Sequence, residues 1–333
     1  MKNRLILVCF SFALLFVSCQ RDHLYYAGDE RAIVRVYVDW SKSQPDPNGV
    51  SAYAYDHATG NLTTPSVVSS DPNFIDLALP VGTYDLFFHN DTPEELNNID
   101  FVAAQNLSTF QALVNSSSES RYNLLSVQSE TRYGGECDVM ATALAKDVAI
   151  STEDVQYFYD KPLAGHYDID KELTVIPMRI TELIDIEVTV NNITSAAGAP
   201  RSLLTDMAQG KYACLSTKTD GLISFEFVLN NRVVDPANHK RATISKKIIS
   251  FGPPDATNEQ ANRLLIMNFI LVNGKTYPVT VDVNKEIKTS FDGMQYLHKI
   301  RVEITLPEAI GNGEGPFNPD VEEWQDVEIG LPI

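Results

Sequence analysis

Apolar residues alternate with polar ones in short segments throughout this 333-residue chain, and no other feature constrains its fold as strongly. A period of two residues places successive side chains on opposite faces of an extended strand, so each segment is predicted to contain half-buried β-strands. Long helical periodicity is absent from the sequence, which predicts an all-β protein. The segments with this β character are residues 31–40, 50–55, 74–90, 173–190, 225–229, 264–283 and 298–306.

Turn-forming residues interrupt two of these segments. Pro80-Val81-Gly82 predicts a strand–turn–strand unit over residues 74–90. Asn273-Gly274 predicts a type I′ hairpin turn, because these two residue types tolerate positive φ angles. The alternation predicts a first core that includes Val36, Val38, Leu77, Leu79, Leu86 and Phe88, with Val34 and Trp40 on the same strand face as the two valines.

The length of the chain predicts two domains, since one domain has on the order of 100–200 residues. A polar, loop-like stretch at residues 160–170 suggests the boundary, which gives an N-terminal domain over 32–165 and a C-terminal domain over 166–333. Residues 173–190 would then open the second domain. Many short strands separated by turns predict antiparallel β-sandwiches for both domains.

The first 18 residues are typical of a secretory signal peptide. Lys2 and Arg4 precede an apolar run over 5–17, which is shorter than the roughly 20 residues of a membrane-spanning helix. Ser18-Cys19 then completes a stretch that resembles a bacterial lipobox, with Phe16 in place of the usual leucine. That resemblance implies acylation of Cys19 and a tether over residues 19–31. The alternative is an ordinary signal peptide with an incidental cysteine.

The chain is acidic, with a net charge of −18 and an isoelectric point near 4.7. Nucleic-acid binding normally requires a basic surface, so this class of function is excluded. A strongly acidic chain suits a soluble body that is held outside the cell.

Motifs that carry enzymatic chemistry are absent from the sequence. The six histidines stand apart, and no Gly-x-Ser-x-Gly, phosphate-binding or calcium-binding loop occurs. We therefore expect no enzyme, no cofactor and no metal. Five oxygen-bearing residues near the C-terminus lack a recognised calcium spacing, so a solvated acidic loop is the favoured interpretation. These residues are Asn312, Glu314, Asn318, Asp320 and Glu322.

Two further groups of residues leave alternatives open. Cys137 and Cys214 could form a disulfide, but two free, mostly buried thiols are favoured because the cysteines fall on opposite sides of the predicted boundary. Several tyrosines could form an aromatic surface for sugars or proteins, although packing in the core and at its rim is favoured. These tyrosines are Tyr25, Tyr26, Tyr37, Tyr53 and Tyr55.

The C-terminal segment 327–333 alternates at every second position and would present one apolar face as an extended strand. Either it closes its own sandwich, or it is donated to the edge or groove of a neighbouring subunit. Its apolar residues are Val327, Ile329, Leu331 and Ile333.

Several stretches resemble the fimbrillin-type lipoproteins, which are subunits and anchors of the type V pili of Gram-negative anaerobes. The similar stretches are the lipobox at Cys19 and residues 36–41, 79–86, 178–190, 272–277 and 321–327. The resemblance implies two tandem transthyretin-like β-sandwich domains and assembly by strand exchange. It also implies fimbrial subunits as partners and a lipid-anchored position at the outer membrane or cell surface.

The role within such a family depends on the N-terminal strand. Stalk subunits of these pili are described as losing their lipid and an early strand after a cut at a basic residue. Here a cut at Arg31 would leave the first strand in place, and a cut at Arg35 would fall inside it. The resemblance therefore implies an anchor-like or accessory member that keeps its lipid. The alternative function is a surface lipoprotein that binds glycan or host protein.

Overall fold

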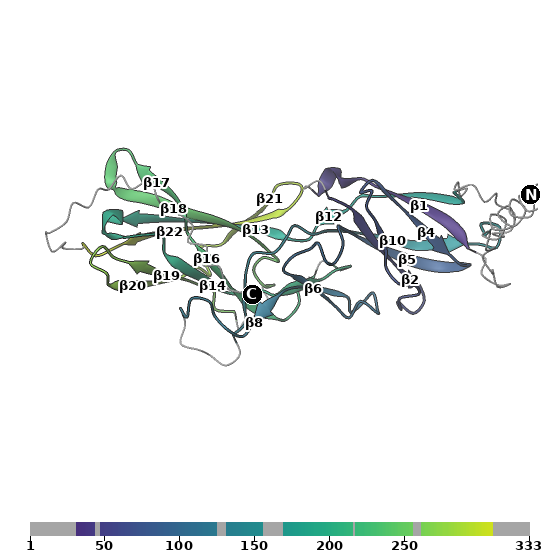
Figure 1. Ribbon diagram of the computed structural model, residues 1–333, viewed down its shortest axis with the longest axis horizontal. Coiled ribbons are helices and arrows are strands. Elements are labelled where there is room, and N and C mark those ends of the chain that lie inside the picture. Colours follow the sequence, from purple (N-terminus) through teal and green to yellow (C-terminus); the bar gives the residue numbers. More distant parts are fainter. Residues whose placement is uncertain are drawn as a thin grey trace, which may run out of the picture.

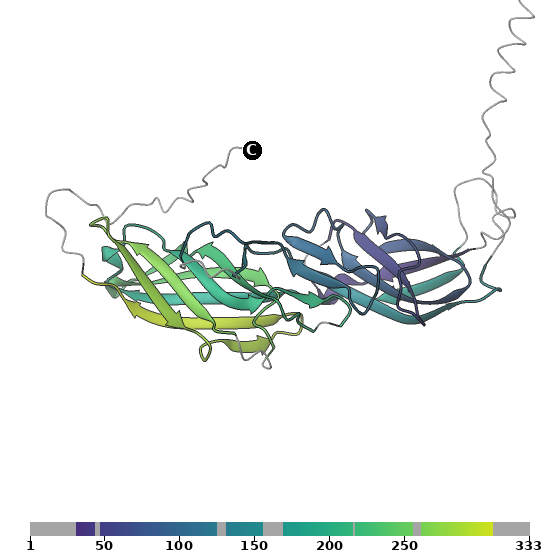
Figure 2. The same cartoon turned by 90° about the horizontal axis from the view of Figure 1, so that it is seen from below.

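The computed structural model describes residues 31–43, 47–124, 131–155, 169–215, 217–255 and 261–308. Regular structure in this part of the chain consists of β-strands and two short 3-10 helices, η1 (Trp40–Lys42) and η3 (Ile193–Ser195), which confirms the all-β prediction. Among these residues, no helix has the length and hydropathy needed to cross a membrane. Figures 1 and 2 show an elongated molecule with two lobes arranged end to end.

The N-terminal lobe is a sandwich of two sheets. The first contains, in spatial order, β11 (Lys171–Val175), β1 (Ala32–Val38) and β4 (Phe74–Leu79). The second contains β12 (Met178–Arg179), β10 (Ala141–Ile150), β5 (Gly82–Asn90), β2 (Val50–Asp56) and β3 (Val67–Ser69). The predicted core of this lobe is confirmed, since Val36, Val38, Leu77, Leu79, Leu86 and Phe88 are all buried in one cluster between the sheets.

The predicted unit over residues 74–90 is wrong in one respect. Strands β4 and β5 are not hydrogen-bonded to each other, because β4 pairs with β1 and β5 pairs with β2 and β10. The chain instead crosses from one sheet to the other at Pro80-Val81. Both strands point their apolar faces into the same core, so the alternation that identifies them cannot distinguish a hairpin from a sheet-to-sheet crossing.

The C-terminal lobe is also a sandwich of two sheets. One contains β17 (Asn231–Asp235), β18 (Asn238–Ser250), β13 (Glu182–Asn191), β22 (Tyr296–Thr305) and β21 (Lys288–Phe291). The other contains β20 (Thr276–Asp282), β19 (Leu264–Ile270), β14 (Arg201–Ala208), β16 (Leu222–Val228), β9 (Tyr133–Gly134) and β8 (Ser116–Ser117). The alternating face of β13, from Ile184 to Val190, is fully buried between them.

Two expectations about strand direction and turn type are wrong. The sheets are mixed, because β1–β11, β13–β22 and β9–β16 pair in parallel. The hairpin of β19 and β20 is confirmed, but its turn is not type I′. Gly274 has a φ of +78°, whereas Asn273 is not among the described residues with positive φ. The Asn273 side chain instead accepts a hydrogen bond from the Lys275 backbone N–H.

A third, smaller sheet connects the two lobes. It contains β15 (Gly210–Tyr212), β7 (Gln111–Val114) and β6 (Ile99–Val102). Ile99, Ala112 and Val114 pack into the C-terminal core. Phe110 and Ala213, which lie next to this sheet in sequence, pack on the outer face of β2 and β5 in the N-terminal lobe. The lobes therefore share packed strands and are not joined by a linker alone.

Strand pairing also indicates where the boundary between the two lobes lies. Residues 173–190 do not form one opening strand of the second domain, because β11 is hydrogen-bonded to β1 and β12 is hydrogen-bonded to β10. The division at residue 165 stays a prediction. The pairing favours a later boundary, between β12 and β13.

Candidate functional site

Of the five tyrosines considered for an aromatic surface, the structure describes Tyr37, Tyr53 and Tyr55, and it excludes such a surface for Tyr53 and Tyr55. Tyr53 and Tyr55 are 6% and 0% exposed to solvent, and their rings lie in one cluster with Phe87 and Phe110. The Tyr55 hydroxyl donates to the Ala104 carbonyl oxygen at 2.9 Å. These tyrosines project outward from β2, but the segment around Phe110 covers them. Core packing, the favoured alternative, is what the structure shows for both.

The other predicted site residues lie mostly outside the described part of the chain. This holds for Cys19, for Tyr25 and Tyr26, for the calcium candidates between 312 and 322, and for the C-terminal residues Val327, Ile329, Leu331 and Ile333. Tyr37 is described and lies on the surface, where its hydroxyl donates to Glu172 at 3.2 Å. Within the described ranges, no group of three or more His, Cys, Asp or Glu side chains could hold a metal ion.

Cys137 and Cys214 are free thiols, as the sequence favoured. Cys137 is buried against the C-terminal core and Cys214 is half-buried beside the aromatic cluster of the N-terminal lobe. Burial raises the pKa of each thiol to about 12. Both therefore stay protonated at neutral pH, and neither is an activated nucleophile.

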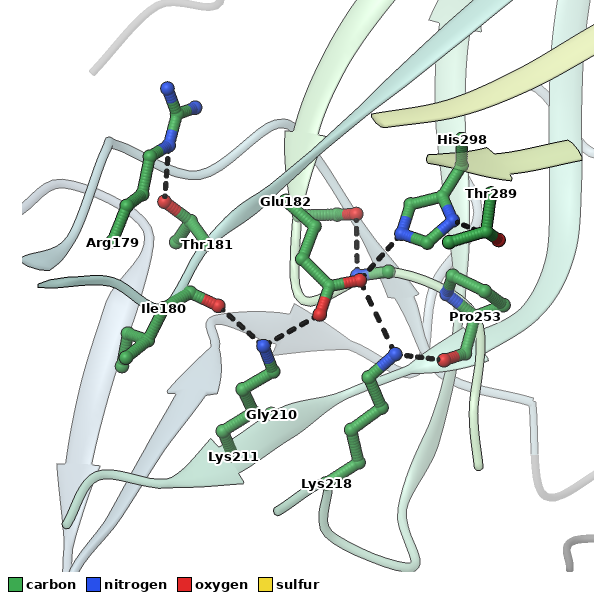
Figure 3. Close-up of polar contacts among 12 residues, drawn as sticks. Arg179, Ile180, Thr181, Glu182, Gly210, Lys211, Lys218, Pro253, Thr289 and His298 are labelled. Carbon is green, nitrogen blue, oxygen red and sulfur yellow. Dashed lines mark hydrogen bonds and ion pairs between the residues drawn. The ribbon is translucent and has the colours of Figure 1, made fainter. Parts of the chain in front are cut away.

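A buried ionic cluster lies where β13, β22 and β15 meet (Figure 3). Glu182 is its centre, and its two carboxylate oxygens contact Lys211 at 2.6 Å and Lys218 at 3.3 Å. His298 Nε2 contacts the same carboxylate, and His298 Nδ1 lies 2.9 Å from the Thr289 hydroxyl. Three of these side chains, Glu182, Lys211 and His298, are at least 95% buried.

The electrostatics of the cluster hold Glu182 in its charged form. Burial alone would raise its pKa, but the hydrogen bond from His298 and the charges of Lys211 and Lys218 together lower the pKa to about 2. Gly252, with a φ of +78°, also packs here, and a Cβ atom at this position would lie 1.8 Å from Glu182 Oε2. A carboxylate that is enclosed, permanently ionised and fully paired is suited to holding strands together and cannot reach a substrate.

Sequence reasoning missed this cluster, although a signal existed for two of its members. Glu182 is in phase with the buried face of β13 that continues through Ile184, and His298 is in phase with Ile300 on β22. A charged residue in phase with an apolar face predicts a buried charge with a partner. The two lysines lie in or near β15 and carry no comparable signal.

The N-terminal lobe also has an open strand edge beside a cavity. On the edge that faces away from β5, β10 pairs with β12 at Ala141 and Thr142 and with no other described strand. Next to this edge lies a cavity of about 390 Å³. It is lined by Leu144 of β10, by Ile176 and Met178, which are 46% and 41% exposed, and by Cys214.

Backbone hydrogen bonding shows which residues of β10 face this open edge. Ile180 N–H donates to the Met140 carbonyl oxygen, so residues 140 and 142 direct their backbone groups toward β12. Because alternate residues of an antiparallel strand bond to the same side, Leu144 presents its N–H and C=O groups to the open edge. An unpaired strand edge of this kind can accept a further strand.

A β-bulge between Ala145 and Val148 interrupts the pairing of β10 with β5, which resumes at Val148. At its tip Asp147 has a φ of +57°. His57 bridges Asp85 and Asp147. Its Nδ1 lies 2.9 Å from an Asp85 carboxylate oxygen, and its Nε2 lies 2.9 Å from an Asp147 carboxylate oxygen. The hydrogen bond to Asp85 and the charge of Asp147 raise the pKa of His57. This bridge ties Asp147 in the bulge to Asp85 of β5.

Similarity to known proteins was found among solved structures. No family model matches the sequence, and no match among curated proteins was found. A candidate adhesin from Bacteroides ovatus has 14% identity over 87% of this chain and 94% of its own, with a TM-score of 0.50. The fimbrial anchor protein Mfa2 from Porphyromonas gingivalis has 10% identity over 82% of this chain and 90% of its own, with a TM-score of 0.47. A candidate polysaccharide-binding protein from Bacteroides thetaiotaomicron has 11% identity over 84% and 92%, with a TM-score of 0.46. The chain thus shares its fold with the Bacteroides ovatus protein.

Proposed function

We propose that this protein is a lipid-anchored, non-enzymatic component of a fimbria-like assembly on the cell surface, and that it joins neighbouring subunits through β-strand contacts. The observation that carries the proposal is the open edge of β10 beside a cavity whose lining includes the apolar side chains of Leu144, Ile176 and Met178. The fold shared with a candidate adhesin and the lipobox at Cys19 support the same conclusion. On this proposal the two lobes correspond to two tandem transthyretin-like domains.

The proposed occupant of the open edge is the C-terminal segment 327–333 of a neighbouring subunit. Its apolar residues recur at every second position, so one face of the added strand would cover the cavity while its backbone bonds to Leu144. Pro332 has no N–H group to donate and suits the outer position of an added strand. Leu144, Ile176 and Met178 would provide the apolar contacts.

The structure of β1 supports the expectation that this member keeps its first strand. β1 is the central strand of its sheet, with β11 on one side and β4 on the other. Arg35 donates two hydrogen bonds to Asp76, at 2.8 and 2.7 Å, and its guanidinium lies 4.5 Å from the centre of the Phe74 ring. A protease cannot reach this arginine without unfolding a core strand. Retention of β1 fits an anchor-like or accessory role.

A binding experiment tests the strand contact. The acceptor is the mature chain without residues 327–333, so that its own segment cannot compete, and the probe is a labelled peptide of residues 321–333. We expect fluorescence anisotropy to show binding that Leu144→Arg weakens at least tenfold, a change of about 1.4 kcal/mol. The matched control is Val233→Arg on the distant edge strand β17, where Val233 is 62% exposed. Absence of binding, or equal affinity for both variants, would contradict the proposal.

The lipid anchor needs a separate test. Cys19→Ala is expected to release the protein from the membrane fraction, because no other segment of the sequence has the length and apolarity to hold it there. Mass spectrometry of the mature N-terminus provides an independent readout. If the variant still fractionates with membranes, a lipid on Cys19 is not what holds the protein there. The proposed strand contact does not depend on this result.

A further inference from the structure

A second, polar cavity lies in the C-terminal lobe, at the end of the sheet where β8 and β9 are added. Its volume is about 190 Å³. Tyr133 and the adjacent Gly134 and Gly135 form part of its wall. The polar side chains around it are Asn98, Asn115, Ser116, Ser117, Glu119, Arg121 and Glu226. These residues come from four separate stretches of the chain, so the cavity is a product of the fold and not of one loop.

One wall of the cavity is fixed by Glu226 on β16. Its carboxylate accepts hydrogen bonds from the Arg121 backbone N–H at 2.9 Å and from the Tyr122 backbone N–H at 3.2 Å, as well as from the Ser120 hydroxyl. Three donors on one carboxylate hold the loop over residues 120–122 against the sheet. The Arg121 side chain is therefore presented from an ordered backbone.

Three other polar groups at the cavity make no hydrogen bond or ion pair with the described residues. They are the Asn115 amide, the Glu119 carboxylate and the Arg121 guanidinium, and all three side chains are exposed. Together they provide N–H donors and oxygen acceptors around one small space. Groups of both kinds, facing a preformed cavity and unused by the fold, are what a polar ligand requires.

The size and charge of the cavity indicate the class of ligand. A volume of about 190 Å³ is below the roughly 300 Å³ at which pockets for drug-sized ligands begin, so it fits a single small unit. Two carboxylates face one guanidinium, which disfavours phosphate and other anions. Hydroxyl groups both donate and accept, so a neutral polyhydroxyl compound can satisfy amide, carboxylate and guanidinium groups at once.

We propose that this cavity binds one neutral sugar residue, with Asn115, Glu119 and Arg121 as its hydrogen-bonding partners and Tyr133 as part of its wall. This inference goes beyond the proposed strand contact and does not depend on it, because the cavity and the β10 edge lie in different lobes. It would give the protein a glycan-binding surface in addition to its subunit contact.

Saturation-transfer difference NMR on the full mature chain tests this proposal. The probes are free D-galactose, D-mannose, L-fucose and N-acetyl-D-glucosamine, with N-acetylneuraminic acid as the anionic comparison. The blocking variant is Gly135→Tyr, because a Cβ atom at Gly135 meets no atom within 4 Å and the larger side chain can enter the cavity without straining the fold. Gly198→Tyr is the matched control, since Gly198 is equally open and lies outside the cavity.

We expect at least one neutral sugar to give saturation transfer with the wild type and with Gly198→Tyr. Gly135→Tyr should lose the signal, and Arg121→Gln should lower the affinity at least tenfold. The proposal is overturned if no neutral sugar gives a signal, if only the anionic sugar binds, or if binding persists in Gly135→Tyr. Failure of this experiment leaves the peptide-binding experiment unaffected, so the two conclusions can be judged separately.

Discussion

Replacing Glu182 by glutamine should destabilise the protein strongly, because the substitution keeps the volume of the side chain and removes its charge. Lys211 and Lys218 would then be left in a buried site without their carboxylate. Breaking a buried ion pair by removing one partner costs about 3–5 kcal/mol. The pKa shift of Glu182 gives a second estimate of its contribution to the free energy of unfolding. A carboxyl group whose pKa falls from 4.5 to about 2 on folding contributes about 3 kcal/mol at neutral pH, at about 1.4 kcal/mol for each pKa unit.

The pH dependence follows from the direction of this shift. The folded-state pKa of Glu182 is lower than the unfolded value, so its contribution is fully present above pH 4.5 and is lost as the pH falls toward about 2. Urea unfolding of wild type and Glu182→Gln, measured by tyrosine and tryptophan fluorescence, should show a large difference in midpoint at pH 7. The difference should shrink steadily below pH 4.5.

A control on the same strand isolates the effect of burial. Glu187 lies on the opposite face of β13, is 43% exposed and contacts Arg301 at 2.8 Å. Exposed pairs of this kind contribute about 0–1 kcal/mol, so Glu187→Gln should leave the urea midpoint nearly unchanged. If Glu182→Gln lowers the urea midpoint as little as Glu187→Gln does, the cluster does not hold the strands together.

Three further predictions concern the N-terminal lobe. Burial lowers the pKa of His89 to about 4, so folding stability should fall by about 3 kcal/mol as the pH drops from 6.5 to 4, when the unfolded state takes up a proton that the folded state excludes. His89→Gln should flatten this part of the stability–pH curve, and an unchanged curve would contradict the assignment. Leu79→Ala should cost about 2–5 kcal/mol in urea unfolding, whereas Val81→Ala, at a side chain that is 48% exposed, should cost under about 1 kcal/mol. An arginine-specific protease acting on the native protein should generate an N-terminus after Arg31 and none after Arg35. A product that begins at residue 36 would show that β1 is removable.

The alternation of apolar residues predicted the core of the N-terminal lobe because burial on a two-residue period depends on local sequence alone. It could not predict strand partners. Leu79 and Leu86 face one core from two different sheets, and nothing local distinguishes this arrangement from a hairpin. The parallel pairing of β13 with β22 joins segments that are more than 100 residues apart, and a local pattern carries no information about such a pairing.

The candidate sites were harder to predict for the same reason. Tyr53 and Tyr55 carry an aromatic pattern that is compatible with a surface, and they are buried because residues around Phe110 cover them. The polar cavity combines residues from four stretches, none of which has a motif. Glu182 was within reach of sequence reasoning, since its position in phase with Ile184 marks it as a buried charge.

Hydrogen–deuterium exchange at β10 tests the proposed subunit contact most directly. The chain without residues 327–333 is compared with and without the peptide of residues 321–333, and exchange is followed at single-residue resolution by NMR. We expect slower exchange of the Leu144 amide, which faces the open edge, with no change on the edge strand β20. Unchanged exchange at Leu144, or protection confined to another strand edge, would show that the segment does not bind at the β10 edge.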